Sequence, residues 1–71
     1  MFTLITSNLM SQVILHCKQS IESQCISNEY DWSYNGNQID IIVDNVDIKD
    51  DIDFCNYHGI DYNEVNSIEL I

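Results

Sequence analysis

The first third of the chain predicts a strand followed by a helix. Residues 2–6, FTLIT, form a short β-branched run of the kind found in strands. The stretch that follows has apolar residues at the spacing of one helical face: Met10, Val13, Cys17 and Ile21. Because Ser7 or Asn8 can accept a backbone hydrogen bond at a helix start, we expect an amphipathic helix over residues 8–23.

From Ile26 the spacing of apolar residues changes to two, which is typical of strands with one buried face. Residues 26–34 and 38–44 are therefore predicted to form two antiparallel strands. Between them lies Asn35-Gly36, a strong hairpin signal, because a type I′ turn needs positive φ at both central residues. The sequence thus predicts a tight hairpin with this dipeptide at its turn.

A two-residue turn at this place also sets the register of the hairpin. An aromatic stripe then faces an aliphatic one: Trp32 lies opposite Ile39, and Tyr30 opposite Ile41. The same register places Asp31 directly opposite Asp40, where like charges destabilise a sheet. The pattern therefore predicts a repulsive acid pair on the polar face of the hairpin.

A second helix and a last strand complete the predicted elements. Asn45 or Asp47 can cap a helix over residues 47–58, and Gly59 suits the C′ position that closes it. The apolar stripe of this helix comprises Ile48, Ile52 and Cys55, with Phe54 alongside. Residues 65–71, VNSIELI, are then predicted to form the final strand.

The predicted elements follow one another in the order β-α-β-β-α-β. This is the order of the ferredoxin-like fold, an α+β arrangement in which an antiparallel sheet carries both helices on one face. A chain of 71 residues is expected to form one domain, residues 1–71. If the aromatic stripe packs on the helices, the open face of the sheet shows Glu29, Asp31, Asp40 and Asp44.

Acidic side chains are concentrated in the second part of the chain. The protein carries 12 Asp and Glu against two Lys, a formal net charge of −10. Residues 1–28 hold Glu22 and Lys18, which cancel, so the whole net charge lies in residues 29–71. Self-repulsion on this scale destabilises a compact state, so we expect the acids to provide an offsetting benefit.

Eight of these acids surround the predicted hairpin and the helix after it: Glu29, Asp31, Asp40, Asp44, Asp47, Asp50, Asp51 and Asp53. Duplex DNA carries one negative charge per about 1.7 Å of axis, and carboxylates along strands and a helix can imitate such a line. We therefore expect these residues to bind a basic, nucleic-acid-binding protein. The alternative is that the charge only confers solubility. With no Arg, the chain is not expected to bind nucleic acid itself, because phosphate repulsion dominates.

Other chemistries fit the sequence less well. The Asp-rich residues 44–54, DNVDIKDDIDF, lack the ligand spacing of an EF-hand calcium loop. The candidate zinc ligands match no strong spacing pattern: His16, Cys17, Cys25, Cys55 and His58. Cys55 and His58 lie three residues apart, but a cysteine on an apolar stripe indicates core, and nearby acids raise its pKa. We expect no enzyme activity, no metal and no cofactor.

Cysteine usage and the N-terminal sequence both favour an intracellular protein. The three Cys are an odd number and fall in apolar patterns, so they are predicted to be reduced and buried. MFTLITSNLM has no basic region and no small-residue cleavage site, so we expect no signal peptide. No apolar run approaches the roughly 20 residues of a membrane span. The predicted location is the cytoplasm.

The composition also resembles that of a class of phage proteins. The chain has no Ala, Arg or Pro, is rich in Ile, Asn and Asp, and has few Lys, as if an AT-rich genome encoded it while cations were excluded. Its small size and the acidic segment 29–71 resemble the phage-encoded inhibitors of host defence, which include anti-CRISPR and anti-restriction proteins that mimic DNA. The resemblance implies binding to a CRISPR effector or restriction nuclease in the host cytoplasm, at its nucleic-acid surface.

Two other functions stay open. An immunity protein or antitoxin that neutralises a basic nuclease toxin would use the same acidic surface. A structural or regulatory subunit would carry the charge for solubility alone and would bind its partner through an apolar patch, insensitive to salt. Residues 1–28 are neutral, so any mimicry is one-sided, and the pattern is compatible with a monomer or a dimer.

Overall fold

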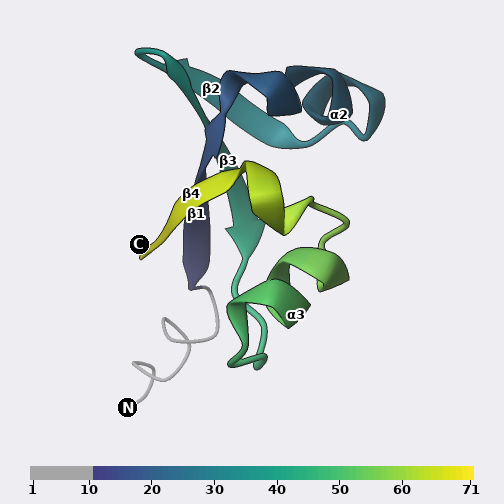
Figure 1. Cartoon of the computed structure of the whole chain (residues 1–71). Helices are drawn as coiled ribbons and strands as arrows, with labels where there is room; N and C mark the ends of the chain where they lie inside the picture. The colour runs from purple at the N-terminus through teal and green to yellow at the C-terminus, as the bar shows by residue number, and fades with distance from the viewer. Residues whose placement is uncertain (1–10) are drawn as a thin grey trace.

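The computed structural model describes residues 11–71 and shows an α+β fold (Figure 1). Its elements are β1 (Gln12–Lys18), the 3-10 helix η1 (Gln19–Ile21), α2 (Glu22–Ser27), β2 (Asp31–Asn35), β3 (Gln38–Asp44), α3 (Asp51–Tyr57), the 3-10 helix η2 (Tyr62–Glu64) and β4 (Val65–Leu70). Strands and α-helices therefore follow one another in the predicted order β-α-β-β-α-β. The strand predicted over residues 2–6 lies outside the described range.

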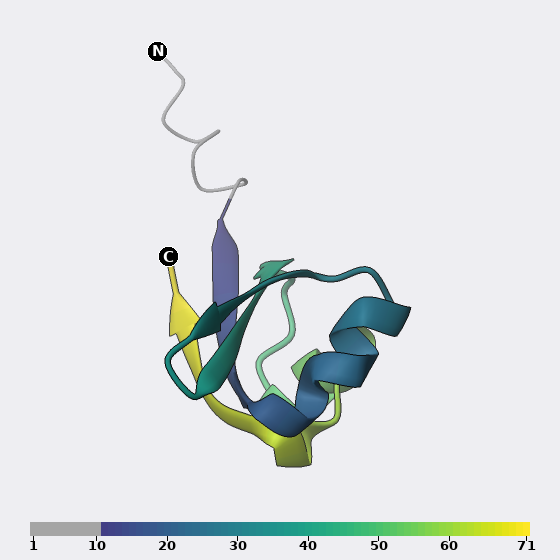
Figure 2. The same ribbon diagram turned by 90° about the horizontal axis from the view of Figure 1, so that it is seen from above.

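Within residues 11–71, four strands form one antiparallel sheet in the order β2-β3-β1-β4. β1 is a central strand and hydrogen-bonds to β3 on one side and β4 on the other. Seen from above, the strands twist and the helical segments lie to one side of them (Figure 2). β4 confirms the final strand predicted over residues 65–71.

The prediction of a helix over residues 8–23 is wrong for residues 12–18, which form β1. Val13, Leu15 and Cys17 are buried and alternate with less buried neighbours, which is the period of a strand. The same stretch also matches a helical period, and a short apolar run does not distinguish the two. The strand is favoured because β1 finds hydrogen-bonding partners on both sides.

The first helical segment follows β1 instead, and it includes Ile26, where the sequence predicts the second strand. It ends in a Schellman motif, in which the N–H of Tyr30 donates to the carbonyl of Cys25 at 3.1 Å. The N–H of Glu29 donates to the carbonyl of Ile26 at 3.3 Å. Glu29 thereby occupies the left-handed position of the motif, with φ of 57°. Glycine is the usual residue there, so the backbone of Glu29 is strained.

The hairpin is present, but its register differs by two residues from the predicted one. Asp31 lies opposite Ile42, and Asp40 lies opposite Ser33. The predicted repulsive pair of Asp31 with Asp40 is therefore wrong. Because the shift is two residues, every side chain keeps its face of the sheet, and the aromatic stripe still meets the aliphatic one.

The turn of the hairpin explains this shift. Its central residues are Gly36 and Asn37, rather than the predicted Asn35 and Gly36. Gly36 has φ of 62° and Asn37 has negative φ, the pattern of a type II′ turn. A type I′ turn at the predicted place would also force Asn35 into the left-handed region. In the observed turn, Gly36 has positive φ and Asn37 does not, and Gly36 has no Cβ to oppose this conformation.

The second helix, α3, begins later than the predicted residue 47, because Asp50 is its N-cap. One carboxylate oxygen of Asp50 accepts hydrogen bonds from the backbone N–H groups of Ile52 at 2.8 Å and Asp53 at 3.3 Å. Gly59 occupies the C′ position with φ of 74°, which confirms the predicted helix end.

The buried stripe of α3 is narrower than predicted. Phe54 and Cys55 are buried, whereas Ile52 is 51% exposed and Ile48 precedes the helix. Ile60 extends the buried surface just beyond the helix end. Its N–H donates to the carbonyl of Cys55 at 2.9 Å, and its side chain is buried.

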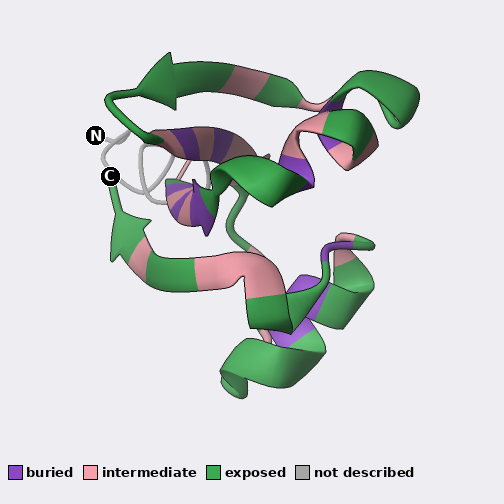
Figure 3. Ribbon diagram, turned by 45° about the horizontal axis from the view of Figure 1, so that its top comes forward, coloured by how far each residue is buried: buried purple, intermediate pink, exposed green. Residues whose placement is uncertain are grey.

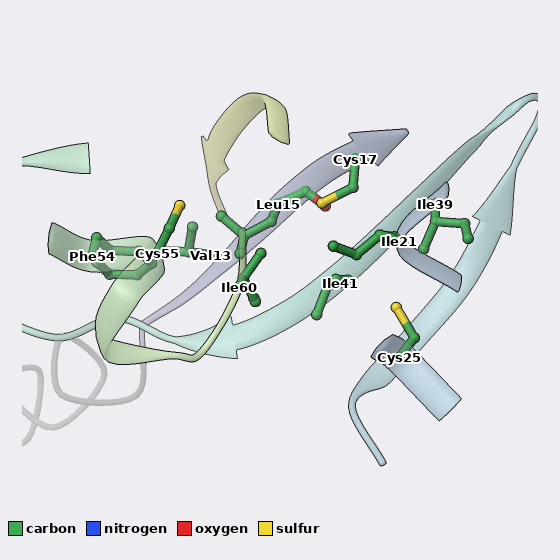
Figure 4. Close-up of a cluster of buried hydrophobic side chains, with 10 residues drawn as sticks. All are labelled: Val13, Leu15, Cys17, Ile21, Cys25, Ile39, Ile41, Phe54, Cys55 and Ile60. Atoms are coloured by element: carbon green, nitrogen blue, oxygen red, sulfur yellow. The ribbon is translucent and has the colours of Figure 1, made fainter. Parts of the chain in front are cut away.

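The core lies between the inner face of the sheet and the helical segments (Figure 3; Figure 4). Its buried residues are Val13, Leu15, Cys17, Ile21, Cys25, Ile39, Ile41, Phe54, Cys55 and Ile60. Tyr30 and Trp32 pack against this cluster, so the aromatic stripe faces the core as predicted. The three cysteines are buried and free of disulfides, which confirms that they are core residues.

Replacing Glu29 by glycine should stabilise the protein by about 1 kcal/mol, since glycine adopts a left-handed conformation without the steric cost of a Cβ. Urea denaturation measures the change in the free energy of unfolding. Glu29→Gln is the matched control, because it removes the same charge and keeps the Cβ. An equal gain in both variants would show that charge, and not backbone strain, is relieved.

Candidate functional site

The sheet side chains that point away from the core form a second face, which we call the open face. They alternate along each strand with the side chains of the inner face. The open face comprises Gln12, Ile14, His16 and Lys18 of β1, Asp31, Ser33 and Asn35 of β2, Gln38, Asp40, Ile42 and Asp44 of β3, and Ser67 and Glu69 of β4. Among the described residues, both helices pack on the other face.

Two rows of side chains cross the open face from β2 to β4. The first row is Asp31, Ile42, Ile14 and Glu69. The second row is Ser33, Asp40, His16 and Ser67. Side chains directly opposite each other have Cβ atoms about 5 Å apart, so neighbours within a row are in contact range. The pairing therefore places Asp40 of β3 and Glu69 of β4 on the two strands that flank His16.

His16 bridges two of these acids. Its Nδ1 lies 2.7 Å from Oδ1 of Asp40, and its Nε2 lies 2.7 Å from Oε1 of Glu69. The other oxygen of Asp40 accepts a hydrogen bond from Nδ2 of Asn35 at 3.0 Å. The side chains of His16 and Asp40 are only 18% and 17% exposed, whereas that of Glu69 is 61% exposed. This network connects β2, β3, β1 and β4 across the open face.

The two carboxylates favour the protonated form of His16. Hydrogen bonds to Glu69 and then to Asp40 raise the pKa of His16 above its ordinary value of 6.5, and partial burial only partly opposes them. An imidazolium can donate from both ring nitrogens, whereas neutral imidazole can donate from one. Loss of the proton therefore breaks one of the two hydrogen bonds.

The eight predicted contact residues lie in three places. Asp31, Asp40 and Asp44 are on the open face, as predicted. Glu29 is not, because it lies in the turn between α2 and β2. The other four surround the start of α3: Asp47 in the preceding loop, Asp50 at the N-cap, and Asp51 and Asp53 in the first turn. The structure thus divides the acids into an open-face group and a helix-start group.

Not all of these carboxylates are available to a partner. Asp40 already binds His16 and Asn35, and Asp50 caps α3. Within residues 11–71, no hydrogen bond or ion pair engages the side chains of Asp31 and Asp44. Both residues are exposed. The open-face group therefore contains two free carboxylates and one that organises its neighbours.

Sequence reasoning missed His16 and Glu69 as members of this face. It placed His16 on a helix and considered it as a zinc ligand. A strand period over β1 would have placed Val13 and His16 on opposite faces of a sheet. The same residues also fit a helical period, which predicts the helix instead. Glu69 lies 53 residues away from His16 in sequence, so nothing local indicates the contact.

The residues considered for zinc and nucleophilic chemistry lie in different environments. His16 and Cys17 are successive residues of β1 and point to opposite faces of the sheet. Burial raises the pKa of the Cys17 thiol to about 12, and it also raises the pKa values of Cys25 and Cys55. His58 packs its ring on that of Phe54, with centroids 4.7 Å apart. In residues 11–71, no three His, Cys, Asp or Glu side chains are grouped to hold a metal ion.

Searches against protein-family models, curated proteins and solved structures found no match to this chain. Within the part of the chain that the structure describes, no helix is long and apolar enough to cross a membrane. The interpretation of the site therefore rests on its geometry and charge.

Asp50→Ala should destabilise the protein by about 1 kcal/mol, because two backbone N–H groups of α3 lose their acceptor. Asp50→Ser keeps a capping oxygen without the charge and should retain most of the stability. Asp51→Ala, one residue further on, is the control for loss of an acid near the helix start. Thermal or urea unfolding ranks the variants, and equal losses for Asp50→Ala and Asp51→Ala would contradict the capping role.

The stability of the protein should fall as the pH rises through the raised pKa of His16. The unfolded chain has the ordinary pKa of 6.5, so the stabilisation is fully present below that pH and is lost at the folded-state pKa above it. His16→Gln should remove this part of the pH dependence, and His58→Gln should keep it. Urea unfolding at several pH values measures both slopes, and identical slopes for wild type and His16→Gln would contradict the network.

Proposed function

We propose that this protein is a small acidic inhibitor, encoded by a phage, that occupies the basic nucleic-acid-binding surface of a host defence complex. The target class is a CRISPR effector or a restriction nuclease. The observation that carries the proposal is the open face, where acids from β2, β3 and β4 lie on a side of the sheet that neither helix covers. The mechanism is competition with nucleic acid for one cationic surface, without catalysis.

The charge of the chain supports this mechanism. A net charge of −10 on 71 residues attracts a basic partner from a distance and speeds encounter. Asp31 and Asp44 are exposed and unpaired within the described residues, so no contact there neutralises either charge. The helix-start acids extend the negative surface beyond the end of β3.

The spacing of the acids can be compared with the spacing of phosphates in DNA. Residues on one face of a strand repeat about every 6.6 Å, whereas phosphates of one DNA strand repeat about every 3.4 Å along the axis. The open face therefore carries fewer charges per length than nucleic acid does. A competitive inhibitor of this kind needs additional contacts that nucleic acid does not make.

The finer fold assignment belongs to the same proposal. We infer a ferredoxin-like topology, in which β1 and β2 run parallel with β3 between them. The antiparallel pairing of β3 with both strands supports it, as does the element order β-α-β-β-α-β. In this topology both helices cover one face, and the other face is left for binding.

Capture from a host lysate tests the proposal. The full chain is immobilised, and bound proteins are identified after elution with salt or with competing DNA. We expect one nuclease or nucleic-acid-guided complex, released by either eluent. A single basic toxin would instead indicate an immunity protein or antitoxin. A partner that resists high salt would contradict an electrostatic mechanism and favour a regulatory subunit.

Charge reversal then locates the surface. Asp31→Lys with Asp44→Lys should weaken capture at least about tenfold, since like charges facing each other cost several kcal/mol. Asp40 is left unchanged, because it holds His16 and Asn35. Asp47→Lys with Asp53→Lys makes the same change of net charge in the helix-start group, away from the open face, and should weaken capture less. Equal losses from both pairs would show that only net charge matters, and circular dichroism confirms that each variant folds.

A further inference from the structure

An apolar pair lies at the centre of the open face. Ile14 of β1 pairs directly with Ile42 of β3. Both side chains are only partly buried, and both helices pack on the opposite face of the sheet. Apolar surface that water still reaches gains free energy when a partner covers it. The open face therefore offers more than charge.

Carboxylates stand at both ends of the row that contains this pair. Asp31 lies opposite Ile42 on β2, and Glu69 lies opposite Ile14 on β4. Neighbouring strands are about 4.8 Å apart, so the row is about 14 Å long from one acid-bearing strand to the other. The row therefore consists of two adjacent isoleucines with one acidic residue on each side.

His16 restrains Glu69 at one end of this row, and Asp40 in the neighbouring row, before any partner binds. Its Nε2 is 2.7 Å from Glu69, and its Nδ1 is 2.7 Å from Asp40. Asn35 holds the second oxygen of Asp40. Side chains that are already ordered lose less entropy on binding, so the network favours a partner that fits this arrangement.

Charge complementarity selects the occupant of the row. A second copy of the chain carries the same net charge of −10, and its acids would repel those of the open face. A neutral apolar segment would cover Asp31 without supplying a counter-charge and would add nothing to the contact of Glu69 with His16. A segment with a basic side chain on each side of an apolar one pairs both acids and covers the isoleucines. In an extended chain, residues i, i+2 and i+4 share one face and span about 13 Å, close to the length of the row.

We propose that the open face receives a cationic protein segment that places an apolar side chain on Ile14 and Ile42, between basic side chains at Asp31 and Glu69. This inference rests on the proposed function, because it names the kind of surface that the inhibitor recognises on its target. Arginine suits the two flanking positions best, since its guanidinium is weakly hydrated and pairs well with carboxylates. The open face carries fewer charges per length than nucleic acid. The apolar contact adds binding free energy that a protein segment gains and that charge alone does not supply.

Two synthetic peptides test the inference against the full chain by NMR titration. Both carry two arginines four residues apart, with serines elsewhere, and one has leucine midway where the other has serine. We expect the leucine peptide to bind about fivefold more tightly and to shift the methyl signals of Ile14 and Ile42. Ile42→Thr should reduce this ratio to near one. Ile26→Thr, at an isoleucine that is 61% exposed on α2, should leave the ratio unchanged.

Three results would overturn the inference: equal affinity for the two peptides, shifts confined to the helix-start group, or no binding of either peptide. The charge-reversed pair Asp31→Lys and Asp44→Lys separates this failure from failure of the proposed function. If that variant loses capture of the lysate partner while Ile42→Thr changes nothing, only the apolar contact is wrong. If charge reversal also leaves capture intact, the proposed function is wrong too.

Discussion

The alternation of side chains along β1 is the constraint on which the rest of the structure depends. One set of its residues, including Leu15, enters the core, and the other set, including His16, forms the middle of the open face. Because β1 pairs on both sides, it positions β3 and β4 together. The contacts of His16 with Asp40 and Glu69 are thus a direct result of the strand that also buries the core.

Local signals predicted several elements, although the hairpin turn and the N-cap of α3 lie at other residues than predicted. Features that depend on distant partners were not predicted. The hairpin, the helix end at Gly59 and the strand β4 were all predicted from neighbouring residues, and all are present. β1 was mistaken for a helix, because its period is ambiguous until β3 and β4 lie beside it. The contact of His16 with Glu69 had no local signal at all. Composition predicted the acidic surface but not which acids share a face.

The acids of this protein have the same chemistry and different roles. Asp50 stabilises a helix start, and Asp40 organises a histidine, so their charges are partly used within the fold. Asp31 and Asp44 contribute repulsion and, within the described residues, no stabilising contact. The distinction between acids that build the fold and acids that face outward comes from geometry, which residue counts do not contain. It also explains why the total charge is a poor guide to which carboxylates are free to meet a partner.

The sheet order places β2 and β4 at the edges, where no further strand of residues 11–71 pairs with them. Unpaired edges invite association between copies, and many proteins protect them with charge. Here Asp31 on β2 and Glu69 on β4 place negative charge on both edge strands, and both belong to the face that we propose binds a basic partner. A polycation that neutralises this surface, or a pH low enough to protonate it, removes that protection. Under the proposed function, binding and resistance to aggregation would therefore be coupled through one set of carboxylates.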